Sequence, residues 1–216
     1  NSNKWQRPIC FNFTSRMSCN LDFSNYLREE GLVYRLVPVE VKDAEYALNV
    51  EAMYTNFMTK FSYRGMNNPS IYSAEEYSRF ALAHRDLALR LASFLYYKGD
   101  NERSKKVLLK MLDVFRDKGT YEEQTIYMLT ARLLLKLNEE SKADKVAAQL
   151  VSDLQGYLDF YLKGGKLSSG IIEHCLGILN QVSMIYEEVG KKDKAEQYSK
   201  LFNRYYEKIT GDLPTK

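Results

Sequence analysis

Histidine and cysteine, two of the residue types that often catalyse reactions or hold metals, are few in this chain and are scattered along it. Its two histidines, His84 and His174, each lie on an apolar helical face. Neither has the His-Glu-x-x-His spacing or another metal-ligand spacing, so we expect packed histidines at the core or its boundary. Adjacent acids such as Glu75-Glu76 recur, but neighbours on a helix point about 100° apart and do not converge on one substrate atom. The residues therefore predict no catalytic group, no metal site and no cofactor.

A glycine-rich segment, Gly164-Gly165-Lys166, invites comparison with a phosphate-binding loop. Phe160 stands at the first glycine position of that motif, and Leu167 stands where Ser or Thr belongs. A helix rather than a strand is expected before it, so the motif is not satisfied. The sequence also lacks a Gly-x-Ser-x-Gly segment or a Cys/His arrangement for nucleophilic catalysis.

The three cysteines, Cys10, Cys19 and Cys175, are too few for a disulfide framework, and none forms a Cys-x-x-Cys pair. We expect buried free thiols. A Cys10–Cys19 bridge is the alternative in an oxidising compartment.

The composition is that of an ordinary globular protein. Of the 216 residues, 45% are hydrophobic and 27% are charged, a balance that argues against disorder. The net charge of +3 is small and the basic residues are dispersed, so a nucleic-acid partner is not expected. No apolar stretch approaches the ~20 residues that a membrane-spanning helix needs.

The fold class follows from a pattern that occurs three times. A turn-forming residue ends an apolar helix, a small residue follows five positions later, and an apolar run continues from there. The three pairs are Gly99 with Ser104, Asn138 with Ala143, and Gly190 with Ala195. Each predicts a helical hairpin with the small residue where its helices cross, and stacked hairpins form a solenoid. Successive turn residues lie 39 and 52 positions apart, against about 34 in a strict tetratricopeptide repeat. We therefore expect a mainly α protein with a tetratricopeptide-like, irregular α-solenoid.

The first forty residues have a different character. Ile9–Thr14 and Leu32–Val39 are rich in aromatic and β-favouring residues and predict two strands. Phe23–Glu30, followed by Gly31, predicts a short helix between them. A two-stranded unit alone would be marginal, so we expect it to pack on the helices behind it.

These patterns divide the chain into three parts. Residues 1–41 form the strand-helix-strand unit, and residues 42–73 form a connector with one helix at Val50–Phe61. Residues 74–216 form the helical hairpins, and we expect the parts to pack as one globular unit.

Aromatic residues exceed what a thin two-helix layer can bury. Packing inside the hairpins is one explanation, and lining of a binding groove is the other, because Tyr suits sites that are apolar at one end and wet at the other. The residues concerned are Tyr96, Tyr97, Tyr121, Tyr127, Tyr157, Phe160, Tyr161, Tyr205 and Tyr206.

Three N-terminal phrases carry a family resemblance: Trp5-Gln-Arg-Pro-Ile-Cys-Phe11, Glu30-Gly-Leu-Val-Tyr-Arg-Leu-Val-Pro38 and Lys60-Phe-Ser-Tyr-Arg-Gly-Met-Asn67. In this order they resemble the C-terminal, extracytoplasmic region of a bacterial family of polytopic membrane proteins, which look like protein O-mannosyltransferases. That family continues into a tetratricopeptide-like helical tail, whose start is matched by Arg85, Arg90, Leu91 and Ala92. The chain departs from the family at Cys10, where Tyr is usual.

The resemblance implies a location and a role. The parent protein would lie in the inner membrane, with this piece on the periplasmic side, tethered by upstream transmembrane helices. The parent would transfer a sugar from a lipid carrier to protein, using acidic residues in loops outside this sequence. A polar lead-in that runs directly into a strand, without an initiator Met, also indicates a domain of a longer polypeptide. This piece would then be a non-catalytic interaction or accessory domain, whose partner is another protein or the membrane part of its own chain.

Two alternatives remain open. One is a free-standing soluble tetratricopeptide-type adaptor that binds a protein or peptide partner in a concave groove. The other is an enzyme in its own right, for which no residue spacing provides the catalytic groups.

Four residues are candidates for an interaction site near the expected membrane junction: Arg7, Tyr34, Arg35 and Arg64. The arginines could contact lipid phosphates or membrane loops of the parent. The alternative is a structural one, in which they pair with Glu29, Glu30 or Glu40 and stabilise the small β unit.

Overall fold

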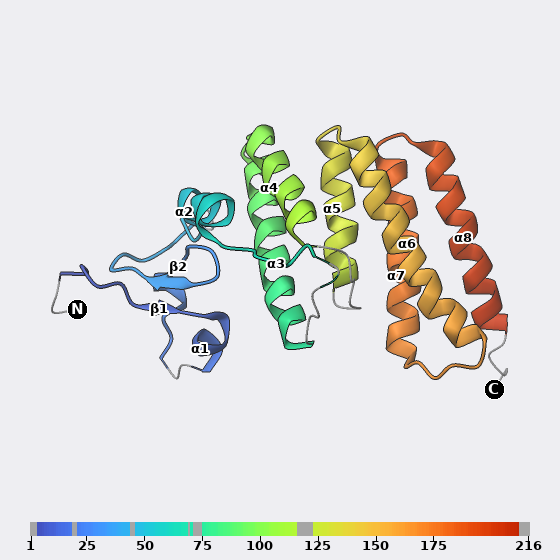
Figure 1. Cartoon of the computed structure of the whole chain (residues 1–216), viewed down its shortest axis with the longest axis horizontal. Coiled ribbons are helices and arrows are strands. Elements are labelled where there is room, and N and C mark those ends of the chain that lie inside the picture. Colours follow the sequence, from blue (N-terminus) through green and yellow to red (C-terminus); the bar gives the residue numbers. More distant parts are fainter. Residues whose placement is uncertain are drawn as a thin grey trace. The chain divides into compact units, whose positions relative to one another are not determined.

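The computed structural model describes residues 4–18, 21–43, 46–68, 70, 75–115 and 123–211. Within these residues it has eight α-helices and three short strands (Figure 1). The mainly α fold class with a small N-terminal β unit is therefore confirmed. Contacts within the chain separate two compact units, residues 1–116 and 117–216. The division at residues 41 and 73 stays a prediction, although by these contacts the first hairpin groups with the strands.

The N-terminal unit begins with a three-stranded antiparallel sheet, not the expected two-stranded one. Its strands are β1 (Cys10–Phe11), β2 (Leu27–Glu29) and β3 (Tyr34–Leu36), in the order β1-β3-β2. A short helix, α1 (Phe13–Ser18), follows β1, and a 3-10 turn, η1 (Ser24–Tyr26), precedes β2.

The segment Phe23–Glu30 was wrongly predicted as a helix. Leu27 and Glu29 are buried while Arg28 between them is half-buried, which is the alternation of a strand. Gly31 has φ of +118° and lies in the turn between β2 and β3, so its role is to reverse the chain rather than to end a helix.

The expected helix at Val50–Phe61 is present in two parts. It starts as α2 (Val50–Thr55) and widens into a π-helical turn, η2 (Asn56–Lys60). The side chain of Asn49 caps α2 by accepting a hydrogen bond from the Ala52 amide at 3.3 Å. Met53 and Phe57 are fully buried and carry this segment's contribution to the core.

The first hairpin completes the N-terminal unit. It consists of α3 (Glu75–Tyr97) and α4 (Asn101–Val114), joined by a turn in which Gly99 has φ of +81°. Ser104 is fully buried at the helix crossing, and its hydroxyl donates to the Ala92 carbonyl at 2.7 Å. The small residue lets the two helices approach closely, as the repeated pattern predicts.

The C-terminal unit contains two further hairpins. The first is α5 (Gln124–Lys136) with α6 (Glu140–Leu162), and the second is α7 (Ser169–Glu188) with α8 (Lys192–Gly211). The helices α6 and α7 also pack on each other. Asn138 and Gly190 turn the chain with φ of 60° and 75°. Ala143 and Ala195 are buried at the crossings, so all three predicted hairpins are confirmed.

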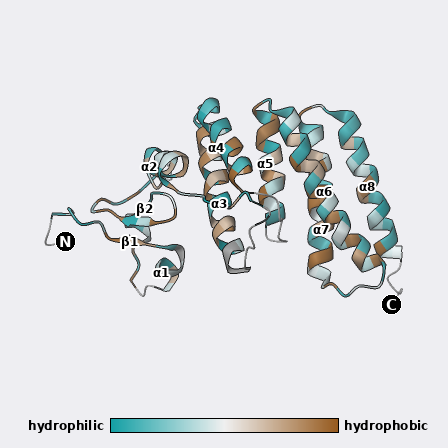
Figure 2. Cartoon of the chain, in the orientation of Figure 1, coloured by the Kyte–Doolittle hydropathy of each residue, from teal (hydrophilic) through white to brown (hydrophobic). Residues whose placement is uncertain are grey.

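The last helix is amphipathic. Figure 2 shows α8 as largely hydrophilic along its visible face. Its buried side chains, Ala195, Tyr198, Tyr205 and Ile209, follow helical spacing along one side. Among the described residues, no helix combines the length and the apolar character that crossing a membrane requires.

Candidate functional site

The four candidate residues do not converge on one point. Tyr34 and Arg35 are neighbours on β3, the central strand of the sheet, so their side chains point to opposite faces. Arg7 is exposed before β1, and Arg64 is exposed in the turn that follows η2. Tyr34 and Arg35 therefore belong to two separate surfaces, one on each face of the sheet.

Tyr34 belongs to the face that packs inward. Phe11, Tyr34 and Glu29 are paired across the three strands, so their side chains share this face. The guanidinium carbon of Arg16, on α1, lies 4.7 Å from the centre of the Tyr34 ring, a cation–π contact. Tyr34 thus helps to position an arginine that the sequence did not single out.

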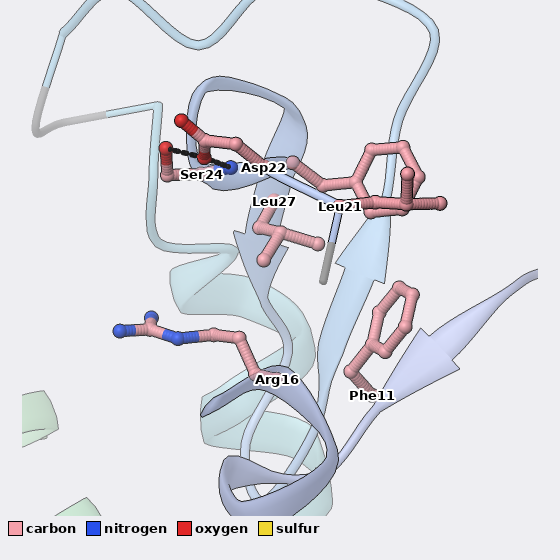
Figure 3. Close-up of a pocket in the computed structure, with 7 residues that line it drawn as sticks. Phe11, Arg16, Leu21, Asp22, Ser24 and Leu27 are labelled. Carbon is pink, nitrogen blue, oxygen red and sulfur yellow. Dashed lines mark hydrogen bonds between the residues drawn. The ribbon is translucent and has the colours of Figure 1, made fainter. Parts of the chain in front are cut away.

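Arg16 stands at a pocket beside this face (Figure 3). The pocket has a volume of about 280 Å³ and mixes apolar walls with a few polar groups. The rings of Phe11 and Phe23 lie 6.0 Å apart at 35°. The residues that line it are Phe11, Arg16, Leu21, Asp22, Phe23, Ser24 and Leu27.

The acidic group of the pocket, the Asp22 carboxylate, already accepts hydrogen bonds from a neighbouring residue. One oxygen of Asp22 accepts hydrogen bonds from the hydroxyl and the amide of Ser24, and both lower the pKa of the carboxyl. The pocket therefore presents one cation, one anion, one serine hydroxyl and two phenyl rings, a combination suited to holding a small ligand. No sequence motif marks this pocket, because its lining residues come from separate short segments between Phe11 and Leu27.

Arg35 and the acids near it test the structural alternative. Arg35 Nη1 lies 3.4 Å from Glu30 Oε2, so this arginine does pair with one of the three expected acids. Glu40 instead pairs with Lys42, at 3.5 Å. Arg64 has no ion pair with any described residue, so the structural alternative is not met there.

Glu29 forms an ion pair with an arginine of α3, a helix that lies far along the sequence. It is buried, and both of its carboxylate oxygens accept hydrogen bonds from Arg90 Nη1 on α3, each at 2.6 Å. Asp86 also accepts from Arg90, at 2.9 Å. Burial opposes the charge on Arg90, but the two carboxylates outweigh it and raise the pKa of the guanidinium. This tie holds the sheet against α3, which confirms the expectation that the β unit packs on the helices behind it.

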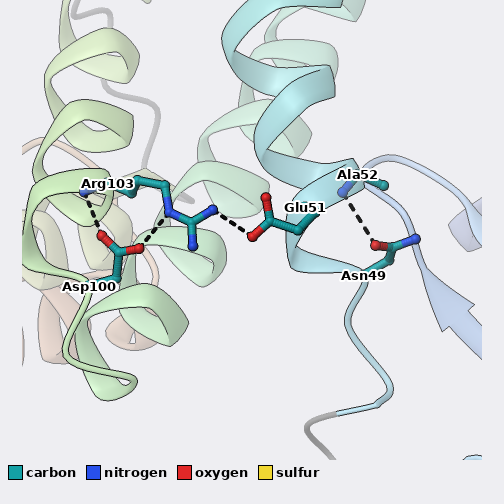
Figure 4. A network of polar contacts seen from close by, with 5 residues as sticks. All are labelled: Asn49, Glu51, Ala52, Asp100 and Arg103. Carbon is teal, nitrogen blue, oxygen red and sulfur yellow. Dashed lines mark hydrogen bonds and ion pairs between the residues drawn. The ribbon is translucent and has the colours of Figure 1, made fainter.

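A second polar network fastens α2 to α4 (Figure 4). Arg103 donates to Glu51 at 2.6 Å and, through Nε, to Asp100 at 2.5 Å. Asp100 in turn caps α4 by accepting from the Arg103 amide at 3.1 Å. The hydrogen bonds from Arg103 lower the pKa of Asp100. The arrangement joins structural elements, and its three charged residues line neither the pocket beside Arg16 nor the groove along α6.

The histidines behave as packed residues, as predicted. His84 lies among aromatic rings, 5.5 Å from Phe61 and 5.8 Å from both Tyr63 and Phe115. Its Nδ1 is 2.7 Å from the Phe80 carbonyl and must carry the proton there. His174 is half-buried, and burial lowers its pKa. Among the described residues, no group of three or more His, Cys, Asp or Glu side chains is placed to hold a metal ion.

The two cysteines within the described residues, Cys10 and Cys175, differ in burial. Cys175 is buried as expected, and burial raises its thiol pKa to about 11, which keeps it protonated and inert. Cys10 is a free thiol but exposed, so the prediction that it is buried is wrong. It lies on the edge strand β1, on the open face of the sheet. Cys19, its proposed bridging partner, lies outside the described residues.

An open groove lies on the C-terminal unit along the end of α6. It has a volume of about 520 Å³ and is lined by Ser152, Asp153, Gly156, Tyr157, Phe160 and Leu167. Two of the surplus aromatics, Tyr157 and Phe160, thus line a groove, whereas Tyr127 and Tyr205 are buried in the hairpins. The ring of Phe160 also covers Gly165, where a Cβ would lie only 2.3 Å from it. That glycine makes room for an aromatic ring.

The comparisons with known proteins concern the N-terminal part. The model of a domain family, TMEM260-associated domain 2, matches residues 1–54. That match covers about a quarter of the chain, including all three strands and all of α2 except its last residue. The family is linked to TMEM260, a protein O-mannosyltransferase-like membrane protein. Neither a curated protein nor a solved structure is significantly similar to the chain.

Proposed function

We propose that the chain is a non-catalytic accessory domain of a membrane glycosyltransferase-like protein. It acts on the periplasmic side of the inner membrane, tethered by transmembrane helices outside this sequence. The parent transfers a sugar from a lipid carrier to protein, with catalytic acids in its membrane loops. The observation that carries the proposal is the match to a TMEM260-associated domain over the segment that contains the sheet and its pocket.

The distribution of exposed apolar side chains supports a contact role for this segment. Six of the eleven exposed large hydrophobic residues that the structure describes fall within the first 46 residues. Four of them are more than 60% exposed, namely Val39 at 69%, Met17 at 67%, and Leu21 and Tyr46 at 64%. Exposed apolar residues mark a protein contact where they adjoin in space, and we propose that these form such a surface. We assign that partner as the membrane part of the same parent chain.

A pair of matched variants of the full-length protein tests this contact. Met17→Asp places a charge in the N-terminal apolar surface, and Met184→Asp places the same charge on α7, where Met184 is 53% exposed. We expect Met17→Asp to reduce sugar transfer to an acceptor protein in membrane vesicles, while Met184→Asp leaves transfer unchanged. Equal transfer by both variants, at equal protein levels, would remove the proposed contact.

A second experiment addresses catalysis and location separately. The isolated chain is incubated with a lipid-linked sugar and an acceptor protein, and we expect no transfer. Turnover by the chain alone would show that it is an enzyme.

A reporter enzyme active only outside the cytoplasm, fused after the chain in the full-length protein, should be active, and an inactive reporter would contradict the periplasmic location.

The groove along α6 favours a second candidate function, a soluble adaptor that binds a peptide. Phe160 is 54% exposed beside Tyr157, which is a suitable surface for an apolar peptide side chain. A peptide library displayed against the isolated chain tests it. Selected peptides that lose binding to Phe160→Ala, and keep it with Tyr97→Ala, an exposed aromatic elsewhere, would favour the adaptor.

A further inference from the structure

The open face of the N-terminal sheet places two arginines directly opposite each other. Arg28 on β2 is paired with Arg35 on β3, and Arg35 is also paired with Cys10 on β1. Paired residues of antiparallel strands share a face, so the three side chains form one row across the sheet. This is the face opposite the one that bears Tyr34, Phe11 and the pocket.

Like charges directly opposite each other destabilise a sheet unless an anion lies between or beside them. The protein provides one nearby acid, Glu30, which lies 3.4 Å from Arg35. That carboxylate also accepts a hydrogen bond from the Asn49 side chain at 2.9 Å, so it is shared. The two guanidiniums and one carboxylate leave one positive charge without compensation.

Arg28 is the side chain that lacks an acceptor. Its guanidinium has no hydrogen-bond or ion-pair partner among the described residues, and its Nε is buried without one. A buried donor without an acceptor loses its hydrogen bonds to water and gains none, so this arrangement is unfavourable unless a further group satisfies it. The row is also accessible, because the Arg35 side chain is 39% exposed and Cys10 is exposed.

We propose that Arg28 and Arg35 together bind a phosphate group. A guanidinium presents its donors as a planar fork that matches the oxygens of a carboxylate or a phosphate. A carboxylate has only two oxygens, and a forked pair with one guanidinium uses both of them, which leaves a poorer geometry for a second guanidinium. A phosphate has additional oxygens and can bridge both arginines while supplying the missing negative charge. The phosphate belongs either to a small soluble phosphate compound or to the headgroup of an anionic lipid.

This site goes beyond the accessory role proposed above and does not depend on it. It can be measured on the chain by itself, without a membrane part or an acceptor protein.

Titration calorimetry of the whole chain with inorganic phosphate tests the site. We expect saturable binding that weakens about tenfold or more in Arg28→Gln and in Arg35→Gln, because each removes one charged fork. Arg79→Gln, on the exposed surface of α3, makes the same change in net charge and should bind like the wild type. Absence of saturable binding, or equal weakening by Arg79→Gln, would overturn the proposal.

Two further measurements keep the result interpretable. If a Gln variant does not fold, as judged by circular dichroism, Arg28→Lys and Arg35→Lys keep the charge and remove the fork, and they should still weaken binding.

Co-sedimentation with phosphatidylcholine vesicles, with and without phosphatidic acid, then identifies the source of the phosphate. Binding that requires phosphatidic acid and both arginines indicates a lipid headgroup, whereas binding of inorganic phosphate alone indicates a soluble compound. Vesicle binding that Arg28→Gln and Arg79→Gln reduce equally would overturn a specific site on the sheet.

Discussion

The sheet of the N-terminal unit and the hairpins of the C-terminal unit are stabilised in different ways. The hairpins bury continuous rows of apolar residues, such as Leu150, Leu154 and Leu158 along α6. The sheet has strands of two or three residues and is held to α3 by the buried pair between Glu29 and Arg90. The hairpins therefore depend mainly on apolar contacts, whereas the sheet depends more on polar ones, and the segments around its strands leave apolar side chains such as Met17, Leu21 and Val39 exposed. This exposed surface makes the N-terminal segment the better candidate for an interaction site.

The largest expected effect is on the C-terminal hairpins. Leu154 is fully buried, so Leu154→Ala should lower the free energy of unfolding by about 3 kcal/mol through lost apolar contact and a residual cavity. Gln149→Ala, at an exposed position of the same helix, should change it by less than about 0.5 kcal/mol. Urea unfolding of both variants measures the difference. A loss below 1 kcal/mol for Leu154→Ala would contradict an apolar origin of this unit's stability.

The next largest loss of stability is expected when the ion pair that holds the sheet to α3 is broken. Arg90→Met keeps the apolar stem and leaves the buried carboxylate of Glu29 without its partner. We expect a loss of about 2 kcal/mol, less than for a fully buried pair because the Arg90 side chain is 40% exposed. Faster hydrogen exchange at the amides of Glu29 and Asn49 should accompany it. Arg79→Met on the same helix is the control, and equal exchange in the two variants would show that the tie is dispensable.

Removing a buried serine hydroxyl should cause a smaller loss of stability, and the loss should be the same in both units. Ser104 and Ser183 are buried, and their hydroxyls donate to the carbonyls of Ala92 and Ala195 at 2.7 Å and 2.8 Å. Ser104→Ala and Ser183→Ala should each lower the free energy of unfolding by about 1 kcal/mol. Urea unfolding measures both. A difference of more than about 1 kcal/mol between the two would show that the hairpins are not packed alike.

The smallest effect concerns pH. Burial opposes ionisation of Asp144, but hydrogen bonds from Lys194 and Tyr186 outweigh it and lower its pKa. Because the pKa is lower in the folded state, the stabilisation is present at neutral pH and is lost as the pH falls below about 4. The wild type should lose stability relative to Asp144→Asn over that range, by less than about 1 kcal/mol since the pair is partly exposed. Thermal unfolding from pH 6 to pH 3 measures this, and parallel curves would exclude the contribution.

The fold was largely predictable where the determinants are local. Gly99, Asn138 and Gly190 each mark a turn, and the small residue five positions later marks the crossing, so the hairpins could be located from short sequence windows. The strand β2 could not, because three residues are too few for alternation to be distinguished from a helical pattern. Its strand conformation depends on pairing with β3, which local propensity does not specify.

The candidate sites were less predictable. Tyr34 and Arg35 were identified, but only the register of the sheet separates them onto opposite faces and places Arg35 opposite Arg28. The pocket needed Phe11 and Phe23 to meet although α1 lies between them in the sequence. Arg64 was identified from a resemblance, and the structure places it in an exposed turn without adding a neighbouring group.

By itself the sequence determined the helical class and the positions of the hairpins, because backbone turns and apolar periodicity act over a few residues. It also determined that the catalytic residue patterns sought do not occur. Only the tertiary structure decided which charges meet, since Glu29 and Arg90 are 61 residues apart and approach through the packing of α3 on the sheet. The faces of a small sheet are likewise set by strand pairing, because a shift of one residue would reverse every side chain.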